Sequence, residues 1–317
     1  MQNILRNTPN SGMSPWLFLL LIGGYVLAGL VGFQFIAPLL TVPFYDFNLM
    51  KTFEVMTNPL SDPTSKVPLL IVQGVVSAGT FILIPGWIVK RYLHISLGEF
   101  FTIERNSYLP SLVTLILVFT FMGFNSFFIY WNMNMELPES MATFESMIRS
   151  MEDQLEILTK HLTSFDSFWQ FLLGFIVIAI IPGVGEELLF RGLIQNTFDK
   201  IFKNPHLAIW LAAFLFGVFH FQFYGVIPRI LLGALFGYLY YFSGHLGYAM
   251  FAHFLNNGFM IVMLYIFQSG WVDYDIETMD NDPNILASLL SGVVSVALIW
   301  TFHKHFSSRQ NGLSKNI

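Results

Sequence analysis

Long apolar stretches of about 20 residues, almost free of charge, recur along the whole of this 317-residue chain. A helix of that length spans the roughly 30 Å hydrocarbon core of a bilayer. Hydrophobic residues make up 55% of the chain and charged residues only 11%, which exceeds what the core of a soluble domain needs. The sequence therefore predicts an all-α, polytopic membrane protein with about eight transmembrane helices. We expect these helices near residues 15–40, 67–89, 109–131, 168–196, 206–224, 227–243, 245–267 and 284–303.

The first apolar stretch begins at Trp16 and runs for about 25 residues, which is longer than the core of a secretory signal peptide. We therefore expect it to be retained as a membrane helix.

Lys and Arg favour the cytoplasmic side of short loops, so they test the orientation of the bundle. With a cytoplasmic N-terminus, the inner side holds Arg6, Lys90, Arg91, Arg105, Arg191, Lys200, Lys203, Lys304, Arg309 and Lys315. The outer side holds only Lys51, Lys66, Arg149, Lys160 and Arg229. The sequence thus predicts that both termini are cytoplasmic.

The outer loops carry most of the acidic residues, and one segment without Lys or Arg holds Asp273, Asp275, Glu277, Asp280 and Asp282. The net charge of −5 reflects these loops and speaks against a nucleic-acid partner. Because the chain has no Cys, thiolate nucleophiles and thiolate metal ligands are excluded. We expect an integral membrane protein surrounded by the lipid bilayer. The high Phe count and the lack of a recognised sorting signal are compatible with a bacterial plasma membrane.

A polar stretch at residues 139–162 has apolar residues at alternating spacings of three and four, which indicates an amphipathic helix on the outer side. These residues are Met141, Phe144, Ile148, Met151, Leu155, Leu158 and Leu162. A short helix of this kind next to a membrane favours packing on the bundle or on the lipid. A dimer contact and a lid that screens substrates are the alternatives.

Two adjacent acidic residues, Glu186 and Glu187, interrupt the apolar run FIVIAIIPGVGEELLFRG. Charged side chains at membrane depth usually face a protein interior or a wet cavity, where they serve a function. Glu187 and Arg191 are four residues apart, so on a helix they share a face and form an ion pair that supports the structure. Glu186 points in another direction and has no cation on its own helix. It is therefore our candidate for a general base.

Two later apolar segments hold polar residues of complementary chemistry, His220 in one and His253 with Asn257 in the other. Phe216 and His220 have the four-residue spacing of a shared helix face, and so do His253 and Asn257. Glu186 with His220 could hold and deprotonate a water molecule. His253 and Asn257 could donate hydrogen bonds to the oxyanion that forms at a peptide carbonyl. Together these roles fit amide hydrolysis without a covalent intermediate.

Each of these residues also has a simpler interpretation. A lone histidine in a membrane more often forms a hydrogen bond between helices than part of a catalytic site. A proton-coupled transporter could use Glu186, His220 and His253 as a relay, although no internal repeat is detectable in the chain. A third alternative is a non-catalytic immunity or scaffold protein of the membrane.

The three motifs together resemble those of the CPBP (CAAX protease and bacteriocin-processing, or Abi) membrane proteases. Residues 186–191 match the EExxxR motif of that family, residues 216–220 match FxxxH, and residues 253–257 match HxxxN, in the same order. The resemblance covers residues 166–268. It implies an intramembrane endopeptidase of eight helices whose site opens toward the cytosol. It also implies that Glu186 and His220 activate water, with His253 and Asn257 as the oxyanion hole.

On this basis the chain divides into three parts. Residues 1–165 hold three membrane helices and the outer amphipathic helix, and residues 166–268 hold the CPBP-like catalytic core of helices four to seven. Residues 269–317 hold the last helix and a cytoplasmic tail. The resemblance implies a membrane-associated peptide or protein as substrate, but a prenylated substrate does not follow from the motifs.

Members of this family have been described both as zinc metalloproteases and as metal-independent glutamate proteases. The chain has no HExxH motif, so a conventional zinc-binding helix is absent. If a divalent metal such as zinc is bound, its candidate ligands are Glu186, His220 and His253, which is a sparse set for a catalytic zinc. We favour water activated by glutamate and leave the cofactor open.

Overall fold

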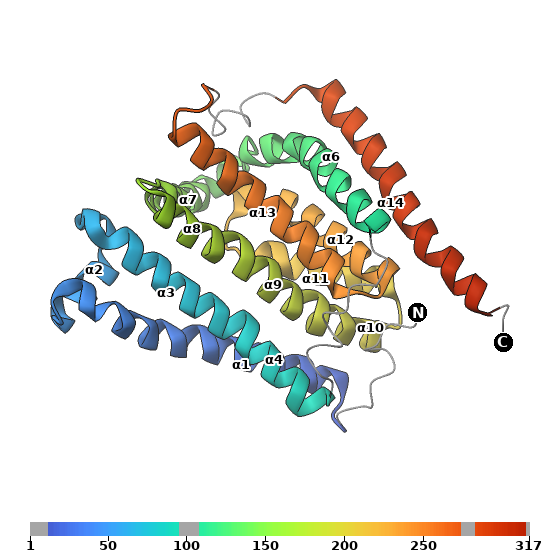
Figure 1. The fold of residues 1–317 in the computed structure, drawn as a ribbon, viewed down its shortest axis with the longest axis horizontal. Coiled ribbons are helices and arrows are strands. Elements are labelled where there is room, and N and C mark those ends of the chain that lie inside the picture. Colours follow the sequence, from blue (N-terminus) through green and yellow to red (C-terminus); the bar gives the residue numbers. More distant parts are fainter. Residues whose placement is uncertain (1–11, 95–107, 274–282, 315–317) are drawn as a thin grey trace.

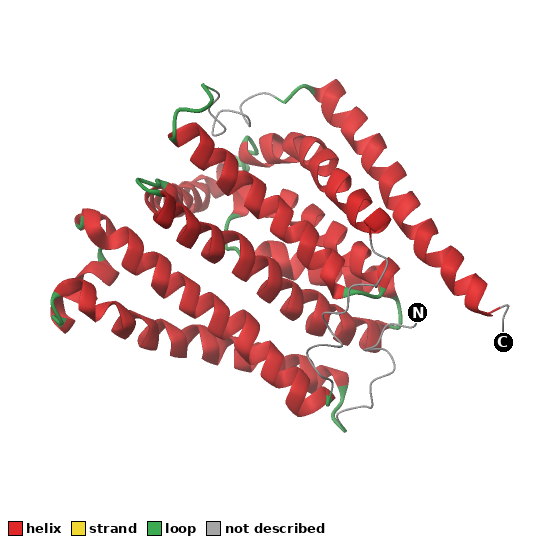
Figure 2. Ribbon diagram, viewed as in Figure 1, coloured by secondary structure: helices red, strands yellow, loops and turns green. Residues whose placement is uncertain are grey.

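The computed structural model describes residues 12–94, 108–273 and 283–314. In these ranges every regular element is helical and no strand is present, as Figure 2 shows. The α-helices are α1 (Pro15–Ile36), α2 (Leu49–Thr57), α3 (Lys66–Ala78), α4 (Ile84–Ile88), α6 (Tyr108–Met133), α7 (Ala142–Thr163), α8 (Phe168–Phe175), α9 (Ile181–Glu187), α10 (Asn196–Phe202), α11 (Pro205–Val218), α12 (Val226–Ser243), α13 (Leu246–Gln268) and α14 (Ile285–Ser314). The prediction of an all-α fold is confirmed.

Shorter helical segments join several of these helices into longer rods. The π-helical segments are Gly79–Leu83, Val89–Leu93, Ile176–Ile180 and Leu188–Gln195. The 3₁₀ segments are Ala37–Tyr45, Pro59–Ser61, Pro63–Ser65, Glu139–Met141 and Phe223–Gly225. One continuous rod therefore runs from α8 through α9 to α10, with π-helical turns on both sides of the acidic pair. Such π-turns are frequent at functional sites.

Seven helices within the described ranges are long and apolar enough to cross a membrane. They are Pro15–Tyr45, Pro63–Leu93, Tyr108–Met133, Phe168–Phe202, Phe223–Ser243, Leu246–Gln268 and Ile285–Ser307. Each corresponds to one of the eight predicted membrane helices, so the chain is a polytopic integral membrane protein. The acidic residues Asp275 to Asp282, together with Arg6, Arg105 and Lys315, lie outside the described residues. The orientation of the bundle in the membrane remains a prediction.

The predicted helix at 206–224 is wrong in extent. The observed helix α11 has 14 residues and ends at Val218, so it is only about 21 Å long. Phe221 has a φ of 54°, in the left-handed region that a right-handed helix cannot contain. The chain turns there and enters α12 through the short segment Phe223–Gly225. The predicted helix was too long because the residues of this turn are largely apolar.

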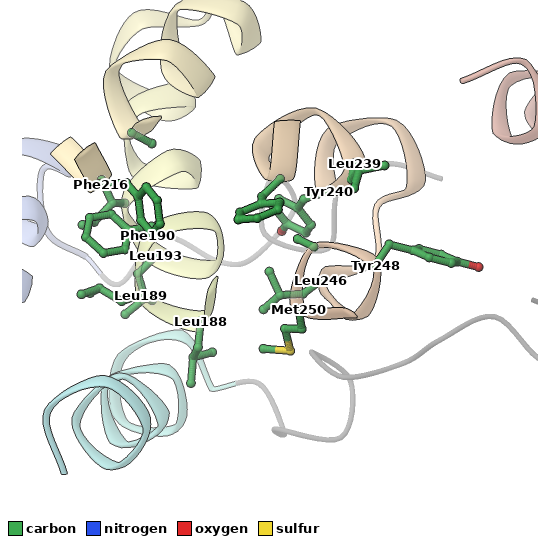
Figure 3. Packing of buried hydrophobic residues seen from close by; sticks show 14 of the residues in the cluster. Leu188, Leu189, Phe190, Leu193, Phe216, Leu239, Tyr240, Leu246, Tyr248 and Met250 are labelled. Carbon is green, nitrogen blue, oxygen red and sulfur yellow. The ribbon is translucent and has the colours of Figure 1, made fainter. Parts of the chain in front are cut away.

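The α9 segment lies inside the bundle, between α3 and α13 (Figure 1). Large apolar side chains from the adjoining helices pack into one buried cluster (Figure 3), which includes Leu188, Leu189, Phe190, Leu193, Phe216, Leu239, Tyr240, Leu246, Tyr248 and Met250. Other large apolar side chains remain exposed on the outside of the bundle, such as Leu20, Phe35 and Val293. A membrane protein presents such side chains to lipid.

The amphipathic helix predicted at 139–162 is confirmed as α7. It lies at the end of the bundle remote from the C-terminal end of α14 (Figure 1). Of the apolar residues of the predicted stripe, Ile148, Leu158 and Leu162 are half-buried. The others, Met141, Phe144, Met151 and Leu155, are exposed. The apolar stripe is thus only partly turned toward the protein, and the charged residues of α7 make much of the contact with the bundle.

Candidate active site

Two glycines allow the helix that carries Glu186 and Glu187 to pack closely against its neighbours. A Cβ atom on Gly183 would lie 3.1 Å from the backbone nitrogen of Phe254 in α13. A Cβ atom on Gly185 would lie 2.8 Å from the Cβ of Phe81. Real Cβ atoms essentially never approach as closely as at Gly185, and at Gly183 a side chain would force α13 to shift by a few tenths of an ångström. The acidic pair is therefore held directly against the helix that carries the last motif.

Glu187 and Arg191 form a fully buried ion pair. Arg191 Nη1 donates to Glu187 Oε1 at 2.8 Å, and both side chains are 0% exposed. Arg191 Nη2 donates to the carbonyl of Gly233 in α12 at 2.8 Å. The guanidinium also lies 4.6 Å from the ring centroid of Phe216. Because neither charge reaches solvent, removing one partner would leave the other buried and uncompensated.

His253 joins this ion pair from α13. Its Nδ1 lies 2.8 Å from Glu187 Oε1, and since a carboxylate only accepts, Nδ1 carries the proton and donates. The imidazole stacks on Phe236 with ring centroids 5.0 Å apart and an interplanar angle of 16°. The other ring nitrogen, Nε2, lies 4.0 Å from Glu186 Oε2. The contact between Glu187 and His253 was not predicted from the sequence, because it depends on the packing of two helices that are distant in sequence.

Glu186 keeps an available acceptor. Its side chain is 16% exposed, and its Oε2 atom is buried without a hydrogen-bond partner. The 4.0 Å separation from His253 Nε2 is beyond hydrogen-bond distance, but a bridging water could link two such atoms. A buried carboxylate oxygen without a partner is costly unless water or another molecule supplies one.

His220 lies in the turn after α11 and not inside a membrane helix as predicted. Its Nδ1 donates to the carbonyl of Phe216 at 2.8 Å, which leaves Nε2 as the nitrogen that can accept a proton. The ring of Phe216 contacts both histidines, with centroids 5.0 Å from His220 and 5.7 Å from His253. His220 also interacts electrostatically with His253. The FxxxH and HxxxN motifs thus meet at Phe216.

Asn257 lies one turn beyond His253 on α13. Its Nδ2 donates to the carbonyl of Ile178 at 3.1 Å, and its Oδ1 accepts a bond of 3.1 Å from Asn256. Ile178 belongs to a π-helical segment. The amide of Asn257 therefore ties α13 to the rod that carries Glu186, and one of its two N–H groups is used in doing so.

A family model for type II CAAX prenyl endopeptidases, described as Rce1-like, matches residues 168–259. Over these residues the chain is similar to the Rce1-like family. The Rce1-like segment runs from α8 into α13, contains all three motifs and lies within the region predicted to be the CPBP-like core. Since the Rce1-like proteins are part of the CPBP family, the predicted resemblance is confirmed. No curated protein and no solved structure matches the chain. The match to this family model indicates an intramembrane endopeptidase of the CAAX-protease type.

The Rce1-like core brings Glu186, Glu187, Arg191 and His253 into direct proximity and links His220 to them through Phe216. Among the residues that the structure describes, no three His, Asp or Glu side chains are grouped closely enough to hold a metal ion. The candidate ligands Glu186, His220 and His253 therefore do not form the set of three protein ligands that a catalytic zinc normally has.

A cavity of about 470 Å³ adjoins the Rce1-like core, beneath α7. Its walls include Asn125, Glu152, Tyr224 and Arg229. Arg229 lies in the first turn of α12, within the helix predicted at 227–243. It donates to Gln222 Oε1 and interacts electrostatically with Glu152 and Glu186. An arginine at the start of an otherwise apolar helix was the available signal for it.

Proposed function

We propose that this protein is an intramembrane endopeptidase that hydrolyses peptide bonds of membrane-associated polypeptides with a water molecule activated by Glu186 and His220. One observation carries the proposal: Glu186 has an unpartnered carboxylate oxygen beside His253, whose other nitrogen is bonded to the buried pair of Glu187 and Arg191. A carboxylate in that position can accept a proton from water without being neutralised by a cation on its own helix.

The proposed reaction begins when Glu186 removes a proton from water, with His220 Nε2 as a second acceptor for the water. The resulting hydroxide attacks the peptide carbonyl and forms a tetrahedral oxyanion. Glu186 then returns the proton to the amide nitrogen, and the C–N bond breaks. Fixed hydrogen-bond donors that face the developing oxyanion lower the barrier in reactions of this kind.

His253 and Asn257 are the proposed donors to the oxyanion. Because Nδ1 of His253 donates to Glu187, donation from Nε2 requires a doubly protonated ring. Such an imidazolium would lie between the carboxylates of Glu186 and Glu187. Asn257 would use the amide N–H that does not bond to Ile178. Glu187 and Arg191 take no direct part and orient His253.

We further propose that activity does not depend on a metal, since Glu186, His220 and His253 fall short of a three-ligand zinc set.

The catalytic unit is proposed to be residues 166–268, with residues 1–165 and 269–317 as supporting membrane segments. A bacterial plasma membrane with both termini in the cytoplasm is the proposed location. The match of the family model to residues 168–259 supports the proposed extent of the catalytic unit.

The decisive experiment compares purified wild type with Glu186→Gln on a library of membrane peptides, with products identified by mass spectrometry. The substitution is nearly isosteric, so the variant should fold while losing the base. Cleavage by wild type alone supports the proposal and defines the cleaved bond. Equal cleavage by both proteins, or none by folded wild type, contradicts it.

A further inference from the structure

We propose that Glu152, on the amphipathic helix α7, is a positioning residue for His220. The inference rests on the proposed function, because His220 matters to catalysis only if the protein is a peptidase. Glu152 does not belong to any of the three motifs and lies 71 residues before Phe223 in the sequence. It acts on the turn that carries His220 and does not contact the proposed reacting atoms.

Three hydrogen-bond distances connect Glu152 to this turn. The backbone N–H of Phe223 donates to Glu152 Oε1 at 2.6 Å. The backbone N–H of Tyr224 donates to both oxygens of the same carboxylate, with N···O distances of 3.2 Å to Oε1 and 3.3 Å to Oε2. Only two residues separate His220 from Phe223, so an anchor at Phe223 restricts where the imidazole can lie.

The N–H groups of His220, Phe221 and Gly225 bond within this part of the chain, whereas those of Phe223 and Tyr224 bond to Glu152. Phe221 has a φ of 54°, which is unfavourable for a residue with a bulky side chain. The N–H groups that precede α12 have no acceptors within the helix. A carboxylate at this end of a helix supplies acceptors and interacts favourably with the helix dipole. Glu152 provides that carboxylate from another part of the chain.

Two further residues on the charged face of α7 contact the same turn. The hydroxyl of Tyr224 donates to Glu145 Oε1 at 2.9 Å. The guanidinium of Arg149 lies 3.9 Å from the centroid of the Tyr224 ring. On the opposite side, Asn132 of α6 donates to the carbonyl of Phe223 at 3.1 Å. The turn is thus clamped between α6 and α7, which explains why the charged residues of α7 face the protein.

The test uses kinetics of Glu152→Ala and Glu152→Gln, with Glu156→Ala as the matched control. Glu156 lies one turn further along α7, is 62% exposed and pairs with Lys160 at 2.9 Å. We expect Glu152→Ala to lower kcat about tenfold or more with KM within about twofold, the pattern for a lost interaction that acts on the chemical step. Glu152→Gln keeps one acceptor oxygen and should restore part of the rate. Glu156→Ala should match wild type.

A double-mutant cycle separates positioning from general support of the fold. If Glu152 acts through His220, then adding Glu152→Ala to His220→Ala should cause no further loss of rate. An equal fold-loss in both backgrounds, or an unchanged kcat in Glu152→Ala, would overturn the inference. Wild-type cleavage that depends on Glu186 must be seen first, so these outcomes differ from failure of the proposed function.

Hydrogen exchange provides a readout that needs no activity. The amides of residues 219–225 should exchange faster in Glu152→Ala than in wild type or in Glu156→Ala, because two of them lose their acceptor. Unchanged exchange in this segment would refute the positioning role even if no substrate had been found.

Discussion

Glu187 and His253 share a hydrogen bond of 2.8 Å across two helices, between residues that are 66 positions apart. The same Glu187 oxygen accepts a bond of 2.8 Å from Arg191. The second acidic residue of the pair therefore neutralises a buried cation and also fixes the tautomer of a histidine beside Glu186. The two carboxylates have different surroundings: Glu187 Oε1 bonds to Arg191 and His253, whereas Glu186 lies 4.0 Å from His253 Nε2. Each carboxylate keeps one buried oxygen, Oε2, without a hydrogen-bond partner.

This difference predicts separate effects of mutations in the acidic pair. Glu187→Ala leaves Arg191 buried without its partner and should destabilise the protein by about 3–5 kcal/mol. Glu186→Gln removes no bonded partner and should melt close to wild type while losing activity. Thermal melting in detergent, measured together with the yield of folded protein, distinguishes the two. Equal melting temperatures for both variants would contradict this division of roles.

Gly233 should be as sensitive as the ion pair that it supports. A Cβ atom there would lie 3.0 Å from the Cα of Ala213 and 3.2 Å from Arg191 Nη2. Gly233→Ala must therefore push α11 or the guanidinium away, at a cost of about 1–3 kcal/mol. Gly24→Ala in α1 is the matched control, because nothing lies within 4 Å of its added Cβ. If both variants melt alike, the packing around Arg191 is looser than these distances imply.

The docking of α7 should depend on pH through Glu145. A hydrogen bond from Arg149, with others from the Leu137 N–H and the Tyr224 hydroxyl, holds the pKa of Glu145 below its usual range. A carboxylate whose pKa is lowered in the folded state stabilises the protein at pH values above its pKa in the unfolded chain. This stabilisation is lost as the pH falls through its pKa in the folded protein. The difference in melting temperature between wild type and Glu145→Gln should thus be largest near neutral pH and disappear in acid. A difference that grows on acidification would contradict the assignment.

The features that the sequence predicted correctly are local ones. Seven apolar stretches became membrane-length helices because length and hydropathy suffice for that prediction, and Glu187 pairs with Arg191 because four-residue spacing fixes it. The contact of Glu187 with His253 depends on how two helices pack, which no spacing encodes. The early end of α11 at Val218 depends on the left-handed backbone of Phe221, and an apolar residue gives no signal for that conformation.

Chelation should leave peptidase activity largely intact. The two histidines and Glu186 do not group as three metal ligands, so the proposed reaction needs only the carboxylate, the imidazoles and water. Activity is to be measured after dialysis against a strong chelator, and again after zinc is added back. Complete loss of activity that zinc restores would show that water activation depends on metal.

The absence of cysteine makes the predicted topology directly measurable. α7 and the C-terminal part of α14 lie at opposite ends of the bundle (Figure 1), so they should lie on opposite sides of the membrane. Ser150→Cys and Lys304→Cys each introduce one exposed thiol at these ends. With cytoplasmic termini, a maleimide that cannot cross membranes should label Ser150→Cys in intact cells, and Lys304→Cys only after permeabilisation. The reverse pattern would place α7 and the adjoining cavity on the cytoplasmic side. That result would overturn the orientation predicted from Lys and Arg. It would agree with the cytosolic opening of the site that the family resemblance implies.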